Sequence, residues 1–75
     1  MIFIIVKSKT KSVILRYEDF SWSIEFENDS AFIMARNNTY SYYMATYNKE
    51  DTETIFKDFD NLFEAFKNKK EYYEM

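Results

Sequence analysis

Two kinds of hydrophobic periodicity divide the chain. Up to residue 47, apolar side chains alternate with polar ones or form short apolar runs, a pattern typical of β-strands. Near the C-terminus they recur at intervals of three and four residues, which is typical of an amphipathic helix. The clearest strand covers residues 21–27, where Trp22, Ile24 and Phe26 face one way and serines and glutamates face the other. The pattern predicts an α+β fold.

Five strands are predicted before the helix. They cover residues 2–6, 13–18, 21–27, 31–36 and 40–47. The first is a continuous apolar run, as expected of a central strand buried on both faces. The connections are short, and two of them contain Asn28-Asp29 and Asn37-Asn38, residue types that tolerate left-handed backbone. Short connections favour an antiparallel meander.

The predicted helix covers residues 58–70. Its apolar stripe consists of Phe59, Leu62, Phe63 and Phe66. Asp58 is a suitable N-cap, and three lysines lie near the end, where the helix dipole favours positive charge. We expect this helix to cover one face of the sheet, and residues 71–75 to be its end or a frayed tail.

Residues 52–57 fit two alternatives. They can form a sixth strand, paired with residues 40–47, or the first turns of a longer helix, because Ile55 and Phe56 extend the apolar stripe backwards. Two threonines and the cap at Asp58 favour the strand. The predicted fold is therefore an antiparallel sheet of five to six strands with one C-terminal helix on one face, in a single domain spanning residues 1–75.

The composition excludes many functions. The 75 residues are 47% hydrophobic and 21% aromatic, enough apolar area for a small single core. The chain has no Cys, His or Gly, and so lacks a thiolate, the commonest general base and the residue that phosphate-binding loops need. We expect a non-enzymatic protein with no cofactor and no bound metal.

The charge and the apolar start indicate the environment. The net charge of −3 argues against nucleic-acid binding by general electrostatic attraction. The apolar run at residues 1–6 is too short for a signal peptide or a membrane span. We expect a cytoplasmic protein with no membrane partner.

The first candidate site is a tyrosine cluster, Tyr40, Tyr42, Tyr43 and Tyr47. Strict alternation places Tyr40 and Tyr42 on one face of the strand, and Tyr43 and Tyr47 on the other. Tyrosine is enriched where proteins bind proteins. The alternative is that the rings fill a small aromatic core.

The second candidate is a pair of acidic blocks. The first contains Glu18, Asp19, Glu25, Glu27 and Asp29; the second contains Glu50, Asp51, Glu53, Asp58, Asp60 and Glu64. Such patches can meet a basic groove, including one that normally holds nucleic acid, or they can simply keep the protein soluble. We expect Glu25, Glu27 and Asp29 to contribute to partner binding together with the four tyrosines.

Two weaker candidates complete the set. The carboxylate pairs Glu25/Glu27 and Asp58/Asp60 could perform acid–base chemistry or bind a metal, although their spacing is not that of a calcium loop. A basic strip could contact single-stranded nucleic acid or protect a hydrophobic edge. That strip consists of Lys7, Lys9, Lys11 and Arg16.

The sequence favours a non-catalytic inhibitor or regulator that binds a protein, with tyrosine anchors and an acidic rim. An immunity protein, or a phage-borne protein that blocks a defence enzyme in a bacterial host, is a role of this kind. The target can be a nucleic-acid-binding enzyme, in which case the acidic residues mimic phosphate. The alternatives are a small nucleic-acid-binding accessory protein and a self-associating structural module, for instance a homodimer.

Overall fold

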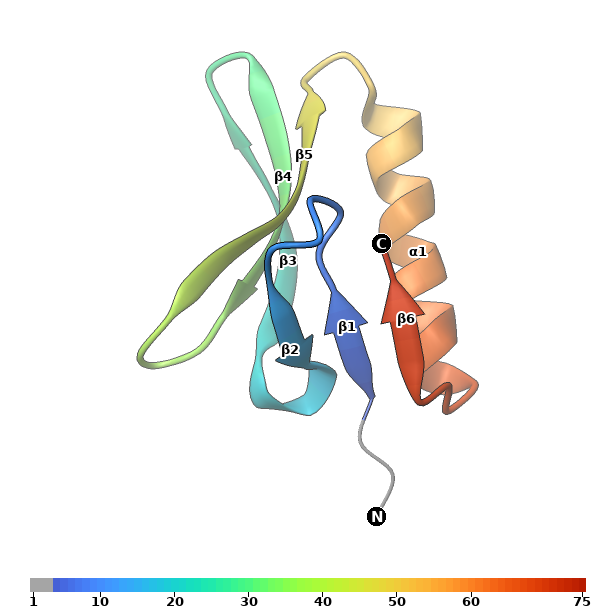
Figure 1. Ribbon diagram of the computed structural model, residues 1–75. Helices are drawn as coiled ribbons and strands as arrows, with labels where there is room; N and C mark the ends of the chain where they lie inside the picture. The colour runs from blue at the N-terminus through green and yellow to red at the C-terminus, as the bar shows by residue number, and fades with distance from the viewer. Residues whose placement is uncertain (1–3) are drawn as a thin grey trace.

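The strands form two three-stranded sheets in the computed structural model, which describes residues 4–75 (Figure 1). The elements are β1 (Ile5–Lys7), β2 (Ile14–Arg16), a 3₁₀ turn η1 (Tyr17–Asp19), β3 (Ser21–Glu27), β4 (Ser30–Arg36), β5 (Ser41–Asn48), α1 (Thr52–Lys67) and β6 (Tyr72–Glu74). The α+β class and the helix near the C-terminus are confirmed. The single sheet of five to six strands is wrong.

The larger sheet is the predicted antiparallel meander, β3-β4-β5. A two-residue turn, Asn28-Asp29, joins β3 to β4, with Asn28 at a left-handed φ of 47°. The β4–β5 pairing contains a bulge: Ile33 lies opposite Ala45, but Met34 lies opposite Tyr43, so Met44 is an extra residue. Side chains on either side of Met44 therefore do not follow one alternation.

The smaller sheet has the order β2-β1-β6, with β1 antiparallel to β2 and parallel to β6. The predicted first strand is shorter than expected, and its residues 2 and 3 lie outside the described part. Val6 is fully buried, but Ile5 is half-buried because its side chain points away from the core. The last residues are neither helix end nor frayed tail, because β6 pairs with β1.

The turn η1 explains why one sheet became two. The Tyr17 amide donates to the Ile4 carbonyl at 2.8 Å, and the Tyr17 carbonyl accepts the Trp22 indole N–H at 3.0 Å. These bonds hold a sharp change of direction between β2 and β3. A hydrogen bond from the Lys9 amide to the Met44 carbonyl, at 2.8 Å, joins the β1–β2 loop to β5.

The helix α1 begins at Thr52, so the preference for a sixth strand over residues 52–57 is wrong. Asp58 is not a cap; it lies inside the helix, and Asp51 occupies the N-cap position. The buried positions are Ile55, Leu62 and Ala65. Phe63, predicted to lie on the buried stripe, is 53% exposed, because the stripe that packs on β4 is rotated towards Ile55.

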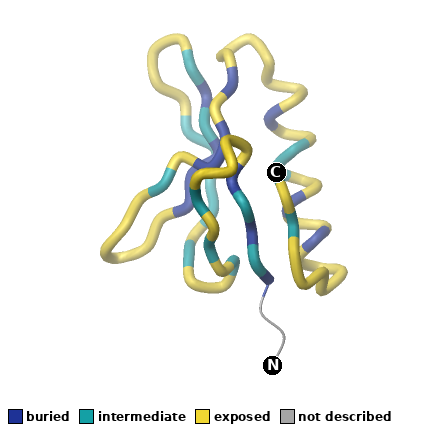
Figure 2. The backbone as a smooth tube through the Cα atoms, in the orientation of Figure 1, coloured by how far each residue is buried: buried dark blue, intermediate teal, exposed yellow. Residues whose placement is uncertain are grey.

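The core lies between the two sheets and the helix (Figure 2). β1 and the larger sheet contribute Ile4, Val6, Ala31, Ile33, Ala35, Met44, Ala45 and Tyr47, and α1 contributes Ile55 and Leu62. Three of the buried β4 and β5 side chains are alanines, whose small size lets neighbouring elements approach closely. The core consequently occupies one side of the β3-β4-β5 sheet.

The helix ends in a Schellman motif made without glycine. The amide of Lys69 donates to the Phe66 carbonyl, and the amide of Lys70 donates to the Ala65 carbonyl, each at 3.0 Å. Lys69 occupies the left-handed position of the motif, with φ at 57°. A residue with a Cβ pays about 1 kcal/mol for this conformation, which glycine adopts freely.

Replacing Lys69 by glycine should therefore stabilise the protein. We expect Lys69→Gly to raise the free energy of unfolding by about 0.5–1 kcal/mol in urea titrations. Lys67→Gly is the matched control, because Lys67 has helical backbone and the same change there should cost about 1 kcal/mol. A loss of stability in Lys69→Gly would contradict the assigned cap.

Candidate functional site

The face of the β3-β4-β5 sheet that points away from α1 is not covered by any other element within residues 4–75 (Figure 1). The cross-strand register places the following side chains on this outer face: Ser21, Ser23, Glu25, Glu27, Ser30, Phe32, Met34, Arg36, Ser41, Tyr43, Thr46 and Asn48. A sheet covered on one face leaves its other face to solvent or to a partner.

An apolar patch lies at the centre of the outer face. It consists of Phe32, Met34 and Tyr43. The rings of Phe32 and Tyr43 are 4.7 Å apart at an interplanar angle of 56°, and Met34 beside them is only 2% exposed. Tyr43 itself is 55% exposed. A partly exposed, packed aromatic pair over a buried methionine is the kind of anchor that protein interfaces use.

An ion pair borders this patch. Arg36 contacts both carboxylate oxygens of Glu25, at 2.7 Å from Nε and 2.6 Å from Nη2, and also donates to Ser41 Oγ at 3.2 Å. The hydrogen bonds from Arg36 hold the pKa of the Glu25 carboxyl below its usual value, and Glu25 raises the pKa of Arg36. Both charged groups are thereby held in a defined position on the surface.

The bulge at Met44 determines where the tyrosines lie. Tyr42 and Tyr47 both face the core, while Tyr43 faces outward, so the expectation that Tyr43 and Tyr47 share a face is wrong. Tyr40 precedes β5; it is 56% exposed and stacks on Tyr42 with ring centroids 5.9 Å apart. Of the four tyrosines, Tyr43 alone lies on the outer face.

Tyr47 contacts side chains from two other parts of the fold. Its hydroxyl donates to Asp58 Oδ2 at 2.6 Å. Asp58 lies on the inner side of α1 because it is three residues after the buried Ile55 and four before the buried Leu62. Lys9 Nζ lies 4.4 Å from the centre of the Tyr47 ring and 3.7 Å from Asp58 Oδ2. Burial, together with the Asp58 carboxylate, strongly raises the pKa of Tyr47. This group links β5, α1 and the β1–β2 loop.

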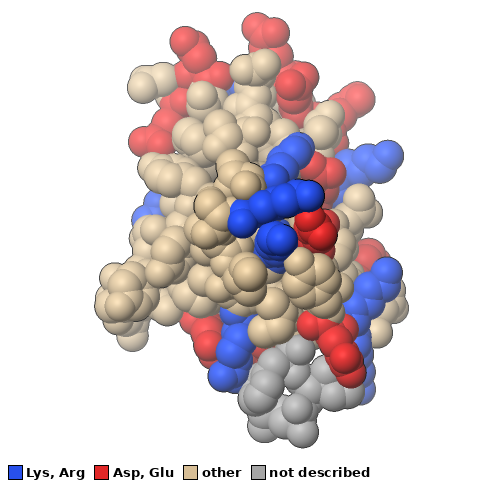
Figure 3. All heavy atoms as spheres, in the orientation of Figure 1, with Lys and Arg blue, Asp and Glu red and all other residues tan. Residues whose placement is uncertain are grey.

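The end of the first acidic block and the start of the second lie together at one end of the molecule. The Lys49 amide, in the loop between β5 and α1, donates to the Asp29 carbonyl in the β3–β4 turn at 3.0 Å. Figure 3 shows acidic side chains gathered at this end. We call it the acidic end, defined by Glu27, Asp29, Glu50, Asp51 and Glu53. It adjoins the outer face, because Glu27 belongs to both.

Three of the four residues of the basic strip contact carboxylates. Lys9 faces Asp58, Lys11 Nζ lies 3.0 Å from Glu74 Oε1, and Arg16 Nε lies 3.5 Å from Asp19. The hydrogen bond to Glu74 raises the pKa of Lys11 and lowers that of Glu74. Phosphate binding by these side chains would have to compete with carboxylates.

The carboxylate pairs are not arranged as catalytic or metal-binding pairs. Asp58 and Asp60 are two residues apart on a helix and so point in different directions, and Asp58 is bonded to Tyr47. Glu25 shares the outer face with Glu27 but is bonded to Arg36. Within residues 4–75, no group of three or more acidic side chains has the geometry to hold a metal ion.

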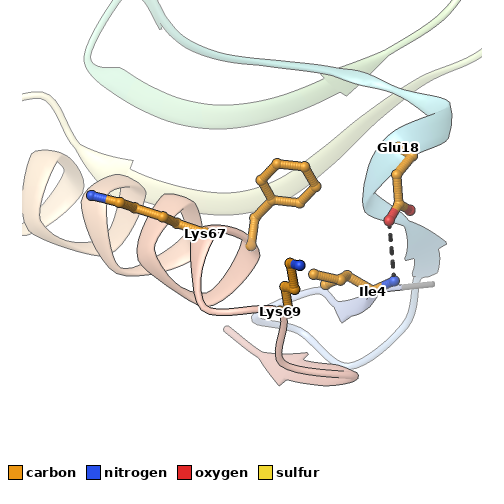
Figure 4. A pocket seen from close by; sticks show the side chains of 5 residues that line it. Ile4, Glu18, Lys67 and Lys69 are labelled. Carbon is orange, nitrogen blue, oxygen red and sulfur yellow. Dashed lines mark hydrogen bonds between the residues drawn. The ribbon is translucent and has the colours of Figure 1, made fainter. Parts of the chain in front are cut away.

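A cleft of about 460 Å³ lies between the end of α1 and η1 (Figure 4). Its described lining consists of Ile4, Glu18, Phe66, Lys67 and Lys69. The Glu18 carboxylate already accepts the Ile4 amide at 3.4 Å, and the Phe66 ring stacks on Tyr17 with centroids 4.3 Å apart. Its acid and its aromatic wall thus serve the packing of η1 against the chain.

Sequence reasoning missed the contribution of β4 to the site. Side chains alternate between the two faces of the predicted fourth strand. One face carries Phe32, Met34 and Arg36, and the other carries Ala31, Ile33 and Ala35. A two-residue turn at Asn28-Asp29 sets the register that places Glu25 opposite Phe32. Extending that register across the hairpin would have placed Phe32 beside Glu25.

The chain shows no significant match to any protein-family model, curated protein or solved structure. No helix in the described range is long and apolar enough to cross a membrane. The outer face and the acidic end are the features of the molecule that bear on its function.

The Tyr47–Asp58 hydrogen bond should be measurable in stability. We expect Tyr47→Phe to lower the free energy of unfolding by about 1–2 kcal/mol, because the Asp58 carboxylate loses a charge-assisted bond. Tyr43→Phe is the matched control, since no hydrogen bond of its hydroxyl is found in the described structure, and it should change stability by less than about 0.5 kcal/mol.

The same hydroxyl should make stability depend on alkaline pH. Folding raises the pKa of Tyr47 above its ordinary value of 10.0, so its contribution is complete below pH 10 and is lost as the pH rises towards the folded-state pKa. We expect Tyr47→Phe to reduce this alkaline loss in urea titrations. Tyr17 and Tyr73, whose pKa values are also raised by burial, should retain part of it. An unchanged pH profile would contradict the assignment.

Proposed function

We propose that the protein is a non-catalytic inhibitor or regulator that binds another protein through the outer face of its β3-β4-β5 sheet. The observation that carries this proposal is the partly exposed aromatic pair of Phe32 and Tyr43, packed over the buried Met34 beside the acidic end, on a face with no covering element in the described chain. Immunity proteins, and phage proteins that block a host defence enzyme, are the kind of protein meant.

The patch supplies the anchor of such an interface. Tyr43 projects from β5 next to the bulge at Met44 and packs against Phe32. It offers a ring and a hydroxyl with few rotatable bonds to lose on binding. The Glu25–Arg36 pair beside it is already satisfied internally and so presents a fixed polar border. Because these side chains already pack against and hydrogen-bond to one another, ordering them on binding should cost little entropy.

The acidic end supplies electrostatic steering. Five acidic side chains lie there, and Lys49 is the cation in the loop between β5 and α1. The net charge of the chain is −3. A basic partner would be attracted to this end and oriented towards the outer face. If the partner's basic surface normally binds nucleic acid, the carboxylates would take the place of phosphates.

The nucleic-acid-binding alternative has less support. Three of the four cations on which it depends, Lys9, Lys11 and Arg16, face Asp58, Glu74 and Asp19. Releasing each cation to bind phosphate would cost its present ion pair and would leave a carboxylate close to the phosphate backbone.

Removing the anchor should weaken partner binding. We expect Tyr43→Ala to weaken binding to the captured partner by about 30-fold, the usual effect of truncating a central aromatic anchor. Tyr40→Ala is the matched control, because Tyr40 is equally exposed but lies off the outer face. Partners retained from host lysate by the wild type and by each variant should be identified and their affinities measured by calorimetry.

Equal retention of one stoichiometric partner by Tyr43→Ala and the wild type would overturn the proposed surface. Loss of binding in Tyr40→Ala but not in Tyr43→Ala would place the interface at the β4–β5 turn. Circular dichroism of both variants should match the wild type, since both side chains are about half exposed.

Charge reversal at the acidic end should slow association. We expect the double variant Glu27→Lys/Glu50→Lys to bind its partner with an association rate about tenfold lower and a weaker salt dependence. The matched control is Asp60→Lys/Glu64→Lys, which changes the net charge equally but at exposed positions of α1. Equal rates in the two variants would show that net charge, and not the acidic end, attracts the partner.

A further inference from the structure

Strand β3 has a free edge along its whole length. It is the terminal strand of the β3-β4-β5 sheet and spans seven residues, the same length as β4. Long unpaired edges are uncommon in monomers, because they present open backbone donors and acceptors that pair with other chains. We therefore expect a strand of another chain to pair with this edge.

The turn geometry shows which backbone groups are open. In a two-residue hairpin, the residues that flank the turn, here Glu27 and Ser30, form a hydrogen-bonded pair. The odd-numbered residues of β3 therefore bond to β4, and the N–H and C=O groups of Trp22, Ile24 and Phe26 point to the free edge. Within the described chain, no other segment hydrogen-bonds to them.

The side chains of β3 are complementary to a second copy of themselves. On the outer face the strand carries Ser21, Ser23, Glu25 and Glu27 in that order. An antiparallel copy centred on Ile24 places Ser21 opposite Glu27 of the copy, and Ser23 opposite Glu25. Each glutamate then lies opposite a serine of the copy, and no two carboxylates lie directly opposite each other. Glu25 keeps its hydrogen bonds to Arg36 and to Ser23 of its own strand.

Neighbouring registers are less favourable. Centring the pair on Glu25 places two glutamates directly opposite each other, a like-charge pair. Centring it on Ser23 places Glu27 opposite Asp19, again two acids, and shortens the paired segment. All three registers pair open backbone groups with open backbone groups, as antiparallel bonding requires, so the side chains decide between them.

The apolar side of β3 provides the driving force. Phe26 is 48% exposed in the monomer, although it lies on the same side of the sheet as the core. In the Ile24-centred register it lies opposite Trp22 of the second copy, and Ile24 lies opposite Ile24. An aromatic cross-strand pair then forms on each side of the axis.

We infer that two copies of the chain associate through antiparallel pairing of their β3 edges about a two-fold axis at Ile24. The result is a continuous six-stranded sheet with the order β5-β4-β3-β3-β4-β5. This interaction uses the edge of the sheet, whereas the proposed partner surface is centred on Phe32 and Tyr43; Glu25 and Glu27 border both surfaces. It predicts a reversible dimer of the full chain between micromolar and millimolar concentration.

Sedimentation velocity over that concentration range tests the inference. Phe26→Pro should leave the β3–β4 bonds intact, because the lost N–H points to the free edge, yet it should abolish the dimer. Phe26→Ala is the matched control: it removes the same ring but keeps the N–H, so it should weaken the dimer without abolishing it.

A second pair of variants tests the register at an exposed position. Ser21→Lys places a cation opposite Glu27 of the copy and should tighten the dimer by about fivefold, and Ser21→Glu should weaken it by about as much. In the monomer Ser21 lies opposite Arg36, so the same two changes should affect monomer stability in the reverse order. If Phe26→Pro fails to fold, as judged by circular dichroism, the two Ser21 variants alone test the proposed dimer.

A chain that remains monomeric at millimolar concentration would overturn the inference. A dimer unaffected by Phe26→Pro and by both Ser21 substitutions would overturn it too, by showing that another surface pairs. Tyr43→Ala should leave the dimer constant unchanged. The two proposals can therefore fail separately: Tyr43→Ala tests partner binding without changing the dimer, and the Phe26 and Ser21 variants test the dimer.

Discussion

The extra residue at Met44 is the constraint on which the rest of the structure depends. Because β5 contains this bulge, Tyr42 and Tyr47 can both face the core while Tyr43 projects from the opposite side of the sheet. The carbonyl of Met44 also accepts the Lys9 amide, the hydrogen bond that joins the smaller sheet's hairpin to β5. One irregular residue therefore both connects the two sheets and selects the tyrosine that is available for binding.

Periodicity predicted the local elements well and their assembly poorly. The alternation in residues 21–27 and the Asn-based turn correctly indicated the β3–β4 hairpin, since both are local signals. The division into two sheets depends on η1, where backbone bonds of Tyr17 reach Ile4, and this is a tertiary effect. β6 was missed because a three-residue strand has almost no periodicity, and its parallel pairing with β1 brings together opposite ends of the chain.

The site was predictable in part, for the same reason. Glu25 and Glu27 were correctly placed on one face, because strict alternation holds within β3. Alternation failed at the tyrosines, because nothing in the sequence marks the bulge at Met44. The strand preference for residues 52–57 failed because the threonines lie in the first turn of α1, where their weak helix propensity costs little compared with the burial of Ile55 and Leu62.

The absence of glycine has a structural consequence for function. Lys11, Asn28 and Lys69 adopt left-handed backbone at positions where glycine would be free of strain. Asn28 is the position where this conformation bears on binding, because its turn sets the β3–β4 register and hence aligns Phe32 with Glu25. The two-fold axis inferred at Ile24 would be perpendicular to the sheet, so both aromatic patches of a dimer would face the same way. A partner with two equivalent sites could then engage both, and its apparent affinity would gain from the second contact without any new type of interaction.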